Sequence, residues 1–98
     1  MNIKTDALEI IHNPAESRFE IWIEGNLSKL DYVEDENSIS MTHVGVHPDH
    51  RGQGVAGKLT EAAFEYARKK SLRAIPVCPY VITFLRRNPQ YVELTKPK

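Results

Sequence analysis

The hydrophobic pattern of this 98-residue chain changes its period at a glycine-rich segment near the middle of the sequence. Before residue 47, short stretches alternate apolar and polar residues, as half-buried strands do. After residue 54, Val55, Leu59, Ala63 and Ala67 recur every four residues, which is the spacing of an amphipathic helix. A chain with this pattern is expected to fold as a sheet that is followed by a helix packed on it.

Five strands and two helices are predicted from this pattern. The predicted strands span residues 7–12, 18–24, 27–33, 38–46 and 72–78, and the predicted helices span residues 54–70 and 79–87. Gly25 and Asn26 form a two-residue hairpin signal between the second and third strands. The alternation slips between Leu27 and Leu30, which indicates a bulge in the third strand.

The fifth strand contains Pro76, which has no N–H for a strand ladder, so this strand is expected to pair poorly or diverge near its end. Pro79 suits the first position of the short helix. The predicted fold class is α+β: a mixed, mostly antiparallel sheet of about five strands, with a long helix after strand four and a short helix after the diverging strand five. One domain is expected over residues 1–98, with a frayed tail from about residue 95.

The composition restricts the expected location and partners. The chain has 13 Lys and Arg against 13 Asp and Glu, whereas a nucleic-acid binder needs a surplus of cations, so no nucleic-acid partner is expected. No apolar run approaches the ~20 residues that span a bilayer, so no membrane partner is expected either. The single cysteine, Cys78, excludes an internal disulfide. A cytoplasmic location is therefore expected.

Residues 47–57, HPDHRGQGVAG, connect the predicted fourth strand to the long helix. The first N–H groups of a helix have no partners within it, and they lie at the positive end of the helix dipole. Glycines let an anion approach such a backbone closely. Because Arg51 can add charge-assisted hydrogen bonds, the segment is suited to a phosphate or a diphosphate.

Other interpretations of this segment agree less well with the sequence. Gly52, Gly54 and Gly57 spell the dinucleotide fingerprint G-x-G-x-x-G. That motif follows a strand almost directly and has an acidic residue about 20 positions later, where this chain has residues 76–78, Pro-Val-Cys. A P-loop is excluded because no Gly-Lys-Ser/Thr follows. The third interpretation, a turn that only starts a helix, is not excluded, although such a turn needs only one residue of positive φ and the segment has three glycines.

Arg51, Gly54 and Ala56, after a strand and before a helix, match the signature R/Q-x-x-G-x-G/A. By this match the chain resembles the GNAT N-acetyltransferase superfamily, and the resemblance covers about residues 10–94. The short length and the Cys-Pro-Tyr sequence at residues 78–80 resemble a subgroup of very small, single-domain members. Those members lack the usual helices between the first two strands, and residues 13–18 are too few to contain them.

The resemblance implies an N-acetyltransferase that moves an acetyl group from acetyl-CoA to an amine. The implied co-substrate is acetyl-CoA or coenzyme A, and the implied partner is an acceptor amine, either a small amine or a protein amino group. A non-catalytic acyl-CoA-binding module is the alternative, because no carboxylate base is evident. The implied coenzyme A-binding residues lie at the end of the fourth strand and in the loop: Val44, Gly45, Val46, Arg51, Gly52, Gln53, Gly54, Val55, Ala56 and Gly57.

Cys78 is the first candidate for a catalytic residue. It precedes the predicted helix start at Pro79, where the positive end of a helix dipole favours a thiolate. The thiol could act as an acid or base, or accept the acetyl group transiently. The alternative is that Cys78 is a small buried hydrophobic residue. Tyr80 is a further candidate to protonate the leaving thiolate.

His43 is the second candidate for a catalytic residue, because an imidazole is a natural base near neutral pH. It alternates with Ile39 and Met41, so its side chain is expected to lie in the same mostly apolar layer. His43, His47 and His50 do not follow a recognised zinc-binding spacing, and no metal is expected.

Overall fold

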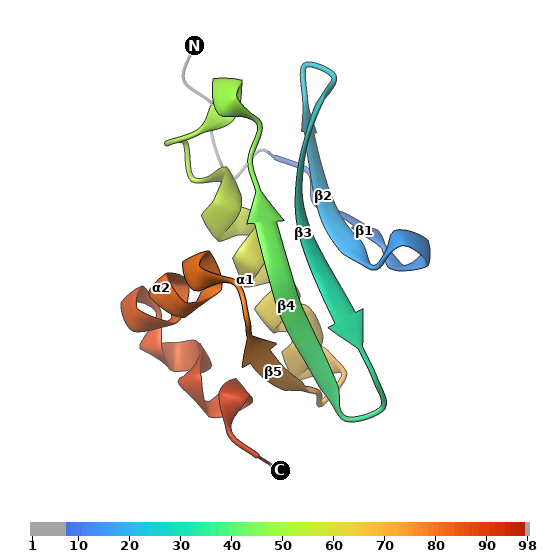
Figure 1. The fold of residues 1–98 in the computed structure, drawn as a ribbon, viewed down its shortest axis with the longest axis vertical. Helices are drawn as coiled ribbons and strands as arrows, with labels where there is room; N and C mark the ends of the chain where they lie inside the picture. Colours follow the sequence, from blue (N-terminus) through green and yellow to red (C-terminus); the bar gives the residue numbers. More distant parts are fainter. Residues whose placement is uncertain (1–7, 98) are drawn as a thin grey trace.

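The computed structural model describes residues 8–97, which form a five-stranded sheet with helices packed behind it (Figure 1). The strands lie in chain order, with antiparallel pairing from β1 to β4 and parallel pairing between β4 and β5. The predicted α+β fold class with a mixed, mostly antiparallel sheet is confirmed. The elements are β1 (Ile11–Asn13), β2 (Arg18–Ile23), β3 (Asn26–Glu34), β4 (Ser38–Gly45), α1 (Val55–Lys69), β5 (Arg73–Pro76), α2 (Pro79–Arg87) and a C-terminal 3-10 helix, η4 (Pro89–Thr95).

The first strand and the first hairpin differ from the prediction. Only Ile11–Asn13 of the predicted strand at 7–12 is a strand, and residue 7 lies outside the described residues. The turn between β2 and β3 consists of Glu24 and Gly25, because Ile23 already pairs with Asn26. Both turn residues have positive φ, 52° and 79°, which suits the right-handed twist of a hairpin.

The bulge predicted between Leu27 and Leu30 is wrong. Ser28, Leu30 and Tyr32 are all buried, so β3 alternates regularly and has a serine at an interior position. The burial of this hydroxyl is compensated, because Ser28 Oγ accepts a hydrogen bond from the His47 N–H at 3.0 Å. A polar residue in the core therefore caused the irregular pattern.

The irregularity of the sheet lies in β4 instead. Asp31 pairs with His43 and Tyr32 pairs with Met41, so Thr42 is an extra residue between two regular pairs. The extra residue reverses the side of the sheet to which the next side chain points: Met41 is fully buried, whereas the His43 side chain is 63% exposed. The expectation that His43 shares the layer of Ile39 and Met41 is therefore wrong.

Helix α1 covers the inner face of the sheet and also packs against α2. The predicted apolar stripe of α1 is confirmed, since its four members are all buried. The Phe64 ring of α1 stacks on Phe84 of α2 and on Tyr91 of η4, with ring centroids 5.8 Å and 5.1 Å apart. This stack holds α2 beside α1, close to the end of β5. Within residues 8–97, no helix is long and apolar enough to cross a membrane.

Candidate functional site

Strands β4 and β5 separate halfway along β4. The last pair of the parallel ladder joins Met41 to Pro76, and the next two N–H groups, of Val77 and Cys78, both donate to the Met41 carbonyl at 3.2 and 3.0 Å. The chain then turns into α2 (Figure 1). In the described part of the chain, residues 42–45 of β4 therefore have no strand on this side. The divergence predicted from Pro76 is confirmed, and it leaves a free strand edge.

The N-terminus of α1 faces this opening without a side-chain cap. Its N-cap residue, Gly54, has a φ of 81°, and Gly52 two residues earlier has a φ of 79°. No described side chain caps α1, and its first turn contains no acidic residue. Within the first turn of α1, no acidic side chain offsets the positive end of the helix dipole.

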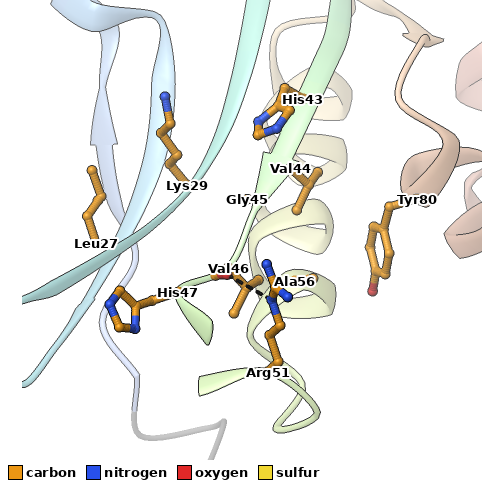
Figure 2. Close-up of a pocket in the computed structure, with 10 residues that line it drawn as sticks. All are labelled: Leu27, Lys29, His43, Val44, Gly45, Val46, His47, Arg51, Ala56 and Tyr80. Atoms are coloured by element: carbon orange, nitrogen blue, oxygen red, sulfur yellow. Dashed lines mark hydrogen bonds between the residues drawn. The ribbon is translucent and has the colours of Figure 1, made fainter. Parts of the chain in front are cut away.

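Two adjoining cavities form a groove over the end of β4. The larger has a volume of about 500 Å³ and the smaller about 230 Å³, and both are lined by Val46, Arg51, Ala56 and Tyr80. Figure 2 shows Leu27 and Lys29 of β3 at one side of the larger cavity and Tyr80 of α2 at the other, with the end of β4 between them. The groove thus joins the outer face of the sheet to the start of α1.

Most of the residues predicted to bind coenzyme A line this groove. Val44 and Gly45 line the larger cavity, residues 52, 54, 55 and 57 line the smaller, and Val46, Arg51 and Ala56 line both. Gln53 lines neither cavity. Arg51 is positioned by a hydrogen bond from its Nε to the Val46 carbonyl at 3.4 Å, drawn as a dashed line in Figure 2.

His43 lies at the outer end of the groove. Its ring lies over Gly45, where an added Cβ would lie only 3.0 Å from His43 Cε1, so the ring position depends on glycine. His43 Nδ1 is 3.8 Å from Asp31 Oδ2, across the β3–β4 pair. An imidazole with a carboxylate close behind it can accept a proton from a group in the groove.

The structure places Tyr80 in the groove wall and Cys78 behind it. Cys78 is 8% exposed, lies at the N-cap of α2, and lines neither cavity. The Tyr80 hydroxyl has no hydrogen-bond partner among the described residues and lies 3.5 Å from the position of a Cβ on Gly57. Burial raises the pKa of Tyr80, against a smaller opposing effect of Arg87. Tyr80 is therefore protonated at neutral pH, like any tyrosine, and its position in the groove wall, not its acidity, makes it a candidate donor.

The histidines of the loop do not form a metal centre with His43. His50 is buried, with Nε2 3.4 Å from Asn26 Nδ2, whereas the ring of His47 lies 5.7 Å from that of His50 and lines the larger cavity. Within residues 8–97, no three His, Cys, Asp or Glu side chains are grouped so that they could hold a metal ion.

The contribution of β3 to the site is not evident from the sequence. Leu27 and Lys29 line the larger cavity because β3 pairs with β4 in a register that puts Lys29 opposite Gly45. Asp31 is placed behind His43 by the same register. The turn between β3 and β4 alone would predict a pairing that is shifted by one residue, because it does not reveal the extra residue Thr42 in β4. Only the position of the bulge could have identified these residues.

A mixed sheet that splays beside a glycine-rich helix start is the architecture of the GNAT acetyltransferase fold. The family model described as GCN5-related N-acetyl-transferase matches residues 18–94, and the chain belongs to this family. A GCN5-like protein from Staphylococcus aureus, whose structure was determined by NMR in solution, superimposes with a TM-score of 0.71 and is 32% identical, over 89% of this chain and 86% of that chain.

Vertebrate proteins are also similar to this chain. Protein NATD1 of Bos taurus is 34% identical over 61 residues, which are 60% of this chain and 54% of the bovine protein. Protein NATD1 of Danio rerio is 28% identical over 92 residues, which are 88% of this chain and 83% of that protein. The match with the bovine protein therefore spans about half of its length. Family and fold together place the chain among the GNAT-type acyltransferases.

Proposed function

We propose that this protein transfers an acetyl group from acetyl-CoA to a primary amine. The observation that supports this proposal is the groove that runs from the uncapped start of α1 to His43, along the edge of β4 that β5 leaves free. Coenzyme A has a diphosphate, an amide-containing pantetheine arm and a thiol end. The groove offers a matching series: an anion site, a free strand edge and a base.

The start of α1 is suited to the diphosphate. Unpartnered N–H groups and the helix dipole attract an anion, and Arg51 lines both cavities beside them. The glycines at 52 and 54 have the positive φ that directs successive backbone groups toward one point. Residues 44–46 would pair with the pantetheine amides, as an added strand does.

His43 and Tyr80 both line the larger cavity and are suited to the two proton transfers of the reaction. His43 would take the proton from the attacking amine, and a backbone N–H near Val44 would stabilise the oxygen of the thioester carbonyl. The leaving thiolate then needs a proton. Tyr80 and Cys78 are the two candidate donors, and the position of Tyr80 in the groove wall supports it.

A non-catalytic acyl-CoA-binding module is the second candidate function. It is favoured by one observation: none of the ten residues lining the larger cavity, within the described chain, is a carboxylate that could serve as the base. This candidate requires binding of acetyl-CoA without release of free thiol for any amine.

Titration with acetyl-CoA, followed by the release of free thiol over a panel of amines, tests both candidates. The proposal expects amide shifts at residues 51–57 and amine-dependent thiol release. Replacing Arg51 by Ala should weaken binding by about tenfold to a hundredfold, the effect of one charge-assisted hydrogen bond. Lys69→Ala, at the far end of α1, is the matched control. Absence of shifts at residues 51–57 at millimolar ligand would overturn the proposal.

Variants of the three candidate catalytic residues separate their roles. His43→Ala should lower kcat by about 10²-fold or more without changing the affinity for acetyl-CoA. If Tyr80 protonates the thiolate, Tyr80→Phe should lower kcat and Cys78→Ala should not. The opposite result would assign the proton transfer, or an acetyl-cysteine intermediate, to Cys78.

A further inference from the structure

We propose that the acceptor is a weakly basic amine, such as the α-amino group of a polypeptide, and not the ε-amino group of lysine. This inference rests on the proposed function and concerns its substrate class. The observation that carries it is the charge of the groove in which the amine must react.

Basic side chains, and no acidic ones, line the groove around the end of β4 in the described part of the chain. Its larger cavity is lined by two permanent cations, Lys29 and Arg51, and by the imidazoles of His43 and His47. Among residues 8–97, no carboxylate lines either cavity. The diphosphate of acetyl-CoA would neutralise Arg51, but Lys29 lies across β4 from the start of α1, on the other side of the cavity (Figure 2).

The nearest carboxylates are engaged with other cations or point to solvent, so neither is free to pair with an entering ammonium group. Asp31 lies behind the groove, and its Oδ2 is already paired with Lys29 Nζ at 3.1 Å. Asp49 is 74% exposed and its Oδ2 lies 3.8 Å from His47 Nδ1, on the solvent side of the loop. An ammonium group entering the groove would lose water and find no free carboxylate in exchange, because Lys29 already holds Asp31.

The acceptor must therefore react from its neutral form. The nitrogen lone pair forms a bond with the acetyl carbonyl carbon, the C–S bond breaks, and the sulfur receives the proton that the amine loses. An α-amino group with a pKa near 8 is about one-tenth neutral at pH 7, whereas a lysine amine with a pKa near 10.4 is neutral in only about 1 molecule in 2,500. The neutral fractions thus differ by about 250-fold.

Two peptides of identical sequence test this inference with the full chain and acetyl-CoA. One has a free N-terminus and an acetylated lysine, and the other has an acetylated N-terminus and a free lysine. kcat/KM is measured by thiol release, corrected for the reaction without protein, and the product is located by mass spectrometry. The expected preference for the α-amine is about 100-fold or more at pH 7. It should shrink by about fivefold to sevenfold for each pH unit between 8 and 10, because the neutral fraction of lysine rises there much more than that of the α-amine.

The variant Lys29→Gln tests whether the groove causes the preference. Removing this cation frees Asp31 to face the entering ammonium, so kcat/KM for the lysine peptide should rise by about threefold to tenfold relative to the α-amine peptide. Lys69→Gln, which removes the same charge at the opposite end of α1, should leave the ratio unchanged.

Three results would overturn the inference. Equal or faster acetylation of the lysine peptide at pH 7 would show that the groove accepts an ammonium group. An unchanged ratio in Lys29→Gln would show that the preference comes from the amines alone. If acetyl-CoA binds but neither peptide nor any other amine releases thiol, the transferase proposal fails, and the acceptor class fails with it.

Discussion

Two glycines at the start of α1 are expected to respond to alanine in opposite directions. Gly57 is the third residue of α1, and a Cβ there would lie at an ordinary contact distance of 3.5 Å from the Tyr80 hydroxyl. Alanine should therefore stabilise the fold by about 0.5–1 kcal/mol, because it loses less backbone entropy than glycine in a helix. Gly52 has a φ of 79°, and a Cβ there meets no described atom within 4 Å. Alanine at Gly52 should cost about 1–2 kcal/mol through backbone strain alone.

The two variants should therefore differ by about 2 kcal/mol in the free energy of unfolding. For a domain of about 100 residues, 1 kcal/mol shifts Tm by roughly 4–8 °C, so their melting temperatures should differ by about 10 °C. Thermal unfolding followed by circular dichroism, without ligand, measures both values against the wild type. A destabilised Gly57→Ala variant, or a Gly52→Ala variant as stable as wild type, would refute the assigned start of the helix.

Three other substitutions test the sheet, the site and the C-terminal segment. Hydrogen bonds from a neighbouring guanidinium, an indole and an amide lower the pKa of Glu20 to about 2. The stabilisation by this carboxylate is thus present above about pH 4.5 and is lost as the pH falls toward 2. In urea unfolding, Glu20→Gln should therefore lower the free energy of unfolding by about 2 kcal/mol at pH 7 and by almost nothing at pH 2. Gly45→Ala should displace the His43 ring and lower kcat about tenfold in the thiol-release assay, while unfolding changes by less than about 1 kcal/mol. Tyr91→Phe should cost about 1 kcal/mol, because its hydroxyl donates to a glutamate of α1 at 3.0 Å. Burial raises the pKa of Tyr91 to about 12, so wild-type stability should fall as the pH rises from about 10 toward 12, and the variant should lose less.

Elements with a strong local signal were predicted well from the sequence. The apolar stripe of α1 and the proline at the start of α2 placed both helices to within one residue of their observed ends. Pro76 correctly predicted where β5 leaves the sheet, because a missing N–H acts locally. The hairpin turn was misplaced by one residue because Glu24, which has no special preference for positive φ, is the first turn residue, while Asn26 already belongs to β3.

The site was predicted only where it lies on one continuous segment. The loop at residues 47–57 was identified from its glycines and arginine, and residues 44–46 were added by the family resemblance; most of these residues line the groove. Lys29 and Asp31 were missed, because their proximity to His43 depends on pairing between strands that are far from each other in the sequence. The buried Ser28 led to the wrong prediction of a bulge in β3, because a buried hydroxyl with a hydrogen-bond partner cannot be recognised from hydrophobicity.

The position of His43 shows why one residue of register matters for function. Without an extra residue, regular alternation would place His43 on the inner face with Met41, which is buried. Thr42 occupies the bulge instead, and its hydroxyl donates to the Asp31 carbonyl at 3.2 Å. His43 is thereby turned to the outer face, onto Gly45 and toward the Asp31 carboxylate. The same bulge lies beside the point where β5 departs after Pro76, so the proposed base is positioned next to the free edge of β4.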